Sequence, residues 1–183
     1  SILLSNISDD AIFVETKAGY AKEMVTGFIK LNGTTVGVVA NRTEVYDAEG
    51  KKAEEFDAVL TTKGSRKAAK FVKFCDAFEI PVLTLTNVKG FKADMHSERG
   101  IAAAVAEMTY AFANATVPKV NVIVGKAYGS AYIVMNSKSI GADMVYAWPQ
   151  AEIGMMDANL AAKIMYADSD AATIKEEAEK YRE

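Results

Sequence analysis

Val-Asn-Val-Ile-Val at residues 120–124, followed by Gly125 and by Lys-Ala-Tyr-Gly-Ser-Ala-Tyr at residues 126–132, is the stretch that decides the fold. The β-branched run predicts a buried strand. Gly129 and the small residues after it allow a tight turn into a helix, whose first N–H groups have no intrahelical partner. Such N–H groups stabilise a developing negative charge, as an oxyanion hole requires. This strand–turn–helix is therefore the first candidate for a functional site.

Strand-like and helix-like segments alternate on both sides of this turn. We expect strands at residues 36–40, 81–86 and 144–149, and helices at residues 65–78, 101–113, 130–137 and 171–182. Ser65 is the expected N-cap of the first of these helices. Residues 87–99 are polar and predict a loop, whereas residues 151–156 predict a short strand or a turn. Short strands separated by helices indicate βαβ units, so we expect one layered α/β domain over residues 1–183.

Composition excludes several classes of function. With 183 residues and half of them hydrophobic, the chain can bury one well-packed core. The formal net charge of -3 gives no basic footprint for nucleic acid. No apolar run approaches the roughly 20 residues that span a bilayer, and the first residues lack a signal-peptide pattern. We therefore expect a cytoplasmic protein. The first residue is serine and not methionine, which suggests a processed product or an excised piece.

The only cysteine, Cys75, lies among aromatic residues on a predicted helix. A single cysteine excludes an internal disulfide and makes a cysteine-based zinc site implausible, so we expect no metal site. A buried structural thiol is the favoured interpretation over a nucleophile.

Several motifs, in order, resemble the C-terminal half of a biotin-dependent carboxyltransferase. They are Ser-Arg-Lys-Ala-Ala-Lys-Phe-Val-Lys-Phe-Cys-Asp-Ala-Phe at residues 65–78, Ile80-Pro81, Gly90-Phe91, Ala-Thr-Val-Pro-Lys at residues 115–119, the run at residues 126–132, and Tyr-Ala-Trp-Pro-Gln-Ala-Glu at residues 146–152. The likeness is strongest over residues 33–156. This family includes the β subunits of propionyl-CoA and related acyl-CoA carboxylases, and decarboxylase subunits that act on methylmalonyl-CoA.

The resemblance implies a crotonase (ClpP-like) spiral of ββα units. It also implies carboxyl transfer between biotin on a carrier protein and a short-chain acyl-CoA, with this chain as the biotin side. The expected partners are a biotin carrier protein, an N-terminal-type carboxyltransferase domain or subunit that handles the acyl-CoA, and further copies of this chain. A membrane partner stays open, but nothing in the residues indicates one.

Carried over to this sequence, the oxyanion donors are the backbone N–H groups of Ser130 and Ala131, and Gly129 provides the turn. The biotin-side pocket would include Gly90 and Phe91. Further ligand-facing candidates are Tyr128, Tyr132 and Ile133. The two tyrosines, four residues apart, are also typical of core or interface packing, and Ile133 fits a helix core equally well. Ser130 stands where the family usually has a second glycine, and the loop at residues 87–94 departs from the family pattern.

Two other functions stay open. ClpP-like peptidases share the fold and place a serine nucleophile at the start of a helix, so Ser130 with His96 and Asp94 could form a triad; the flanking motifs are, however, those of the carboxyltransferases. Alternatively, the chain is a non-catalytic subunit or assembly domain, because it resembles only one of the two halves that the family's active site needs. An exposed apolar face for the missing half predicts self-association.

Overall fold

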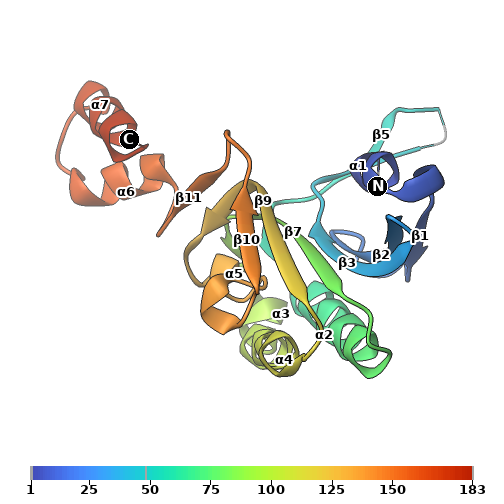
Figure 1. Ribbon diagram of the computed structural model, residues 1–183. Coiled ribbons are helices and arrows are strands. Elements are labelled where there is room, and N and C mark those ends of the chain that lie inside the picture. Colours follow the sequence, from blue (N-terminus) through green and yellow to red (C-terminus); the bar gives the residue numbers. More distant parts are fainter. Residues whose placement is uncertain (1, 48, 183) are drawn as a thin grey trace.

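A seven-stranded mixed sheet forms the centre of the chain (Figure 1). The computed structural model describes residues 2–47 and 49–182, without the side chain of His96. The strand order is β1 (Phe13–Thr16), β2 (Met24–Leu31), β3 (Thr34–Asn41), β7 (Val82–Val88), β9 (Lys119–Tyr128) and β10 (Met144–Ala147). The first three strands are antiparallel, and β3, β7, β9 and β10 are parallel. The short β11 (Glu152–Gly154) pairs in parallel with the end of β9.

Two helices, α2 (Thr62–Ala77) and α4 (Ile101–Asn114), lie side by side on one face of the sheet (Figure 1). On the opposite face, α1 (Ile2–Ile7) packs near β2. The smaller elements are the 3-10 turns η1 (Asp9–Ala11) and η2 (Lys138–Ile140), the hairpin of β4 (Glu44–Tyr46) and β5 (Lys52–Glu55), and the parallel pair of β6 (Val59–Leu60) and β8 (Gly90–Phe91). Short helices α3 (Met95–Glu98) and α5 (Gly129–Ile133) follow β8 and β9.

The C-terminal helices α6 (Ala158–Met165) and α7 (Ala171–Arg182) pack against each other and extend away from the sheet beyond β11 (Figure 1). Their contact is made by small residues, because Ala158, Ala161, Ala162 and Ala178 are all buried. Within the described ranges, no helix is both long and apolar enough to cross a bilayer.

The alternation of side chains along β3 divides the core into two parts. Val39 faces the helices and packs in a cluster with Val72 of α2 and Phe112 of α4. Val38 and Ala40 face the other way and pack with Leu4 of α1. Because successive strand residues point to opposite faces of a sheet, one short apolar strand serves both parts of the core.

The strands and helices that were predicted occur in the predicted order, with corrections at several boundaries, whereas β1, β2 and α6 were not predicted. Helix α2 begins at Thr62, one turn earlier than predicted, and its N-cap is Thr61, whose hydroxyl accepts the Gly64 N–H at 2.9 Å. The predicted N-cap at Ser65 was wrong, because Ser65 lies inside the helix and is fully buried. Residues 87–99, predicted as a loop, contain β8 and α3, and α5 ends at Ile133.

A buried polar network fixes the segment that follows α5. The Thr86 hydroxyl donates to Asn121 Oδ1 at 2.8 Å, and Asn121 Nδ2 donates to the Met135 carbonyl at 3.1 Å. Asn136 Nδ2 donates to the Thr84 hydroxyl at 3.1 Å. All four side chains are inaccessible to solvent, where an unmade hydrogen bond is costly. Residues 135 and 136 are therefore held against β7 and β9.

Replacing Gly37 by alanine should destabilise the fold. A Cβ at this position of β3 would lie 2.5 Å from Cys75 Sγ and 3.3 Å from the Phe71 ring, so these buried side chains of α2 would have to shift. Overpacking of this kind costs about 1–3 kcal/mol of unfolding free energy. Chemical denaturation measures the loss. Gly19→Ala is the control, because nothing lies within 4 Å of its Cβ; equal losses for both variants would contradict the close approach of β3 and α2.

Replacing Asn121 by alanine should be more damaging. It leaves the Thr86 hydroxyl and the Met135 carbonyl without their bonds to the amide in a solvent-free site, which we expect to cost roughly 2–4 kcal/mol. Denaturant unfolding gives the stability, and the amide NMR signals of residues 130–136 report the local order. Asn114→Ala, at an exposed helix end, should change neither the stability nor these amide signals. An Asn121→Ala protein as stable as this control would show that the network is dispensable.

Candidate functional site

The turn between β9 and α5 has the geometry that its sequence predicts. Tyr128 ends the strand in an extended conformation, and Gly129 adopts a φ of 54° in the left-handed region. A Cβ at Gly129 would lie 2.9 Å from the Met155 carbonyl oxygen. Both the dihedral angle and the close approach of the Met155 backbone therefore require glycine.

Two backbone donors are available at the start of α5. The N–H groups of Ser130 and Ala131 belong to its first turn, where no intrahelical acceptor exists. The structure records no acceptor for either of them among the described residues. Ala131 is only 1% exposed, whereas the Ser130 side chain is exposed. Two N–H groups of consecutive residues are therefore without a recorded acceptor at this turn.

Strand β8 lies next to this turn. Gly90 and Phe91 pair with Val59 and Leu60 of β6, and β8 contacts α5. Phe91 packs against the same apolar cluster as Ala131. The structure thus brings together two segments, residues 90–91 and 129–133, that the sequence analysis connected only through a resemblance.

Tyr128 links the turn to β11. Its hydroxyl donates to the Glu152 carboxylate, and the neighbouring Lys126 ammonium lies 3.4 Å from Asp157 Oδ2. Burial, followed by this hydrogen bond, raises the pKa of Tyr128, so the phenol stays protonated and acts as a donor. Its position favours the packing interpretation of Tyr128, since the side chain is 5% exposed and engaged with β11.

The other two α5 candidates have different surroundings. Tyr132 is partly buried against the core cluster, and burial raises the pKa of its phenol. Ile133 is 42% exposed. It is therefore not a core residue in this chain, and its side chain is available to a ligand or to another protein surface.

Two other carboxylates and the cysteine near these elements have structural surroundings. Asp76 accepts the Thr116 N–H at 2.6 Å and the Thr116 hydroxyl at 3.1 Å, while Glu152 is bonded to Tyr128. The two carboxylates thus have separate structural roles. Cys75 is fully buried, and burial raises the pKa of its thiol to about 12. It is the structural thiol that the sequence predicts.

Of the hypothetical triad, Asp94 is engaged in capping α3. Its carboxylate accepts the Ser97 N–H at 2.7 Å, which lowers its pKa, and it lies 3.5 Å from the Lys92 ammonium. The side chain of His96 lies outside the described part of the structure. Ser130 is the exposed third member.

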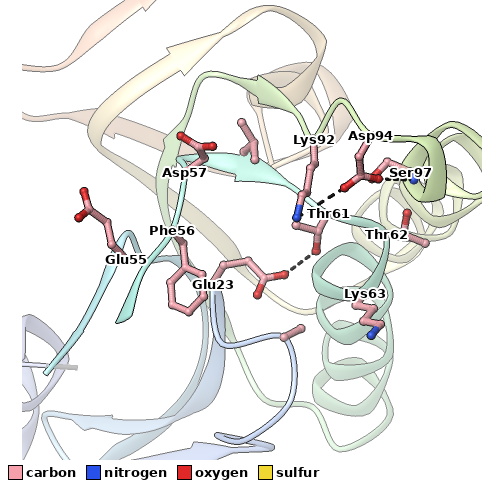
Figure 2. A pocket seen from close by; sticks show the side chains of 12 residues that line it. Glu23, Glu55, Phe56, Asp57, Thr61, Thr62, Lys63, Lys92, Asp94 and Ser97 are labelled. Atoms are coloured by element: carbon pink, nitrogen blue, oxygen red, sulfur yellow. Dashed lines mark hydrogen bonds and ion pairs between the residues drawn. The ribbon is translucent and has the colours of Figure 1, made fainter. Parts of the chain in front are cut away.

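A polar cavity of about 520 Å³ opens beside β6 and the start of α2 (Figure 2). The Thr61 hydroxyl donates there to the Glu23 carboxylate, and Lys92 and Asp94 also line the cavity. The cavity touches β6 through Val59, the partner of Gly90. The sequence analysis missed Glu23 and Thr61, because they are far apart in the chain and no short motif joins them. In the described ranges, no three His, Cys, Asp or Glu side chains are placed to hold a metal ion.

Comparison with known proteins gives a consistent result. The model of the carboxyl transferase domain matches residues 2–183. The propionyl-CoA carboxylase beta chain of Roseobacter denitrificans is 46% identical over 165 residues, which are 90% of this chain and 30% of that protein. The methylmalonyl-CoA carboxyltransferase 12S subunit of Propionibacterium freudenreichii subsp. shermanii is 41% identical over 98% of this chain and 34% of its own length.

A solved structure agrees with these matches. Transcarboxylase 12S, crystallised with methylmalonyl-coenzyme A and described as a hexamer assembly, superposes with a TM-score of 0.87 at 41% identity. The match covers 98% of this chain and 34% of the solved chain. The chain therefore spans about a third of the length of the relatives that it matches. Its mixed α/β architecture is that of the 12S structure, and the chain belongs to the carboxyl transferase domain family.

Proposed function

We propose that this chain supplies the biotin-facing half of an acyl-CoA carboxyltransferase, as a single crotonase-like (ClpP-like) domain of ββα units over residues 1–183. The observation that carries the proposal is the pair of backbone donors, Ser130 and Ala131 N–H, at a glycine turn beside β8. In this proposal Gly90 and Phe91 form the adjoining wall of the biotin pocket. Tyr128, which is bonded to β11, holds the turn in place from behind.

The chemistry explains why backbone donors suffice. When a carboxyl group leaves biotin, negative charge develops on the ureido oxygen, and two N–H groups fixed by the fold can stabilise it without reorganising. Ala131 is almost inaccessible to water, and a donor in such surroundings has a stronger electrostatic effect than one in water. No acid–base side chain is needed at this step, so Ser130 acts through its N–H and not through its hydroxyl.

The other substrate and the partners follow from the same proposal. The relatives' names point to propionyl-CoA or methylmalonyl-CoA as the acyl-CoA class. An N-terminal-type carboxyltransferase domain would hold that thioester, and a carrier protein would present biotin. Large apolar side chains are exposed from β10 to α6, which supports docking of that domain or of further copies. The most exposed are Met144, Tyr146, Ile153, Met155, Leu160, Ile164 and Met165.

Biotin at millimolar concentration should shift the amide NMR signals of Ser130 and Ala131 selectively and saturably in isotope-labelled chain. Ala131→Pro removes one of the two donors and should abolish these shifts, whereas Ala131→Gly keeps the N–H and should preserve them. Circular dichroism and the remaining amide signals check that both variants are folded. A folded Ala131→Pro protein that binds biotin like Ala131→Gly would contradict the role of this N–H.

An activity assay separates the proposed function from its alternatives. Carboxyl transfer should require the acyl-CoA half and a biotinylated carrier in addition to this chain, and Ser130→Ala should keep most of the rate because the backbone donor survives. Loss of all activity in Ser130→Ala, with peptide cleavage by the unmodified chain, would identify a peptidase. A fully assembled complex without biotin-dependent activity would identify a non-catalytic assembly domain.

A further inference from the structure

A second cavity, of about 260 Å³, lies between the β1–β2 ribbon and helix α2. Its lining consists of three phenylalanines, three lysines and two threonines, and contains no carboxylate. The lining includes no residue of β8 or α5, the elements of the proposed biotin site. A ligand here would therefore be recognised independently of carboxyl transfer.

The apolar part of the cavity is an aromatic cluster. The ring centroids of Phe28 and Phe71 are 5.2 Å apart, and those of Phe28 and Phe74 are 6.1 Å apart. These three rings come from β2 and from one face of α2. Phe74 remains 45% exposed, although aromatic rings gain free energy by leaving water. The cluster is therefore suited to covering the apolar body of a small molecule.

The polar part contains a buried cation. Lys67 is 3% exposed, and its ammonium donates to the carbonyls of Tyr20 at 2.8 Å and Ala21 at 3.3 Å. No carboxylate among the described residues lies within 4 Å of it. Loss of hydration lowers its pKa, and the charges of Glu15 and Glu23 offset this only partly. An ammonium has three donors, and these two carbonyls use two of them.

Lys17 and Lys70 add two exposed positive charges to the same lining. Neither forms an ion pair with a carboxylate in the described ranges. Three lysines without a close ion pair among the described residues, beside three aromatic rings, are complementary to one class of ligand, an anion with an apolar body. The volume is slightly below the roughly 300–1,000 Å³ that is typical of sites for drug-sized ligands, which limits that body to a short chain or a single ring.

We propose that this cavity is a binding site for a small monocarboxylate, with its carboxylate at Lys67 and Lys70 and its apolar body on Phe28, Phe71 and Phe74. Recognition combines charge-assisted hydrogen bonds with burial of apolar surface. The uncharged analogue of such a ligand would lose the charge-assisted hydrogen bonds and keep the burial of apolar surface.

The test uses hexanoate and its neutral analogue hexanamide, titrated into isotope-labelled chain. Hexanoate should shift the amide signals of Thr26, Phe28, Lys70 and Phe74 saturably, and hexanamide should bind about tenfold more weakly because it lacks the charge. Shifts of equal size and affinity for the two compounds, or no saturable shift with hexanoate, would overturn the proposal.

Lys70→Gln should weaken hexanoate binding about fivefold to tenfold. Lys73→Gln is the matched control, because it removes the same charge from the same helix but lies over the Tyr110 ring, at 5.9 Å. It should leave the affinity unchanged. Lys17→Gln provides an independent second variant at an exposed position. If Lys70→Gln and Lys17→Gln both bind hexanoate as tightly as Lys73→Gln does, the lysines of the cavity do not recognise the ligand and the assignment is wrong.

Discussion

The hydrogen bonds of two buried asparagines, Asn121 and Asn136, determine where the candidate site can form. Asn121 belongs to β9, and Asn136 follows α5 with a positive φ of 57°. Together they tie the chain on the far side of α5 to the backbone and hydroxyls of β7 and β9. A five-residue helix has little stability of its own. The sheet therefore holds α5 from both ends, through the β9 turn before it and the asparagines after it.

The same constraint explains why the donors of α5 can stay unpaired. A short helix held at both ends is restrained from moving toward acceptors for its first N–H groups, and its N-cap residue, Tyr128, makes no side-chain capping bond. Tyr128 contributes from outside by bonding Glu152 of β11. The unsatisfied donors are thus a consequence of rigid surroundings, which is the condition under which they are useful for binding an anion.

The local patterns in the sequence predicted the strongly apolar strands and the long helices well. Val36–Ala40 lies within β3, because burial on both faces gives a continuous apolar run, and residues 101–113 lie within α4, because burial along one stripe gives a helical period. The antiparallel β1 and β2 were missed, because Gly27 and Lys30 interrupt the apolar pattern of β2. These two strands are defined by their pairing with each other, which a local pattern does not show. The N-cap was misplaced because Ser65 and Thr61 are equally good caps locally, and only tertiary packing chooses between them.

The local geometry of the candidate site was predictable in part, and the limits have a physical origin. The glycine turn was visible in the sequence, because only glycine satisfies both the dihedral angle and the approach of the Met155 carbonyl. The cavities were not visible in the sequence, because the residues that line them become neighbours only after the strands pair. The departures from the family pattern leave the turn itself intact. The residue Ser130 is exposed, and in the altered loop Asn87 accepts the Lys126 N–H at 3.0 Å. In the altered loop, Asp94 caps α3. A site built from backbone donors can therefore tolerate changes in the side chains around it, provided that the turn and its anchors remain.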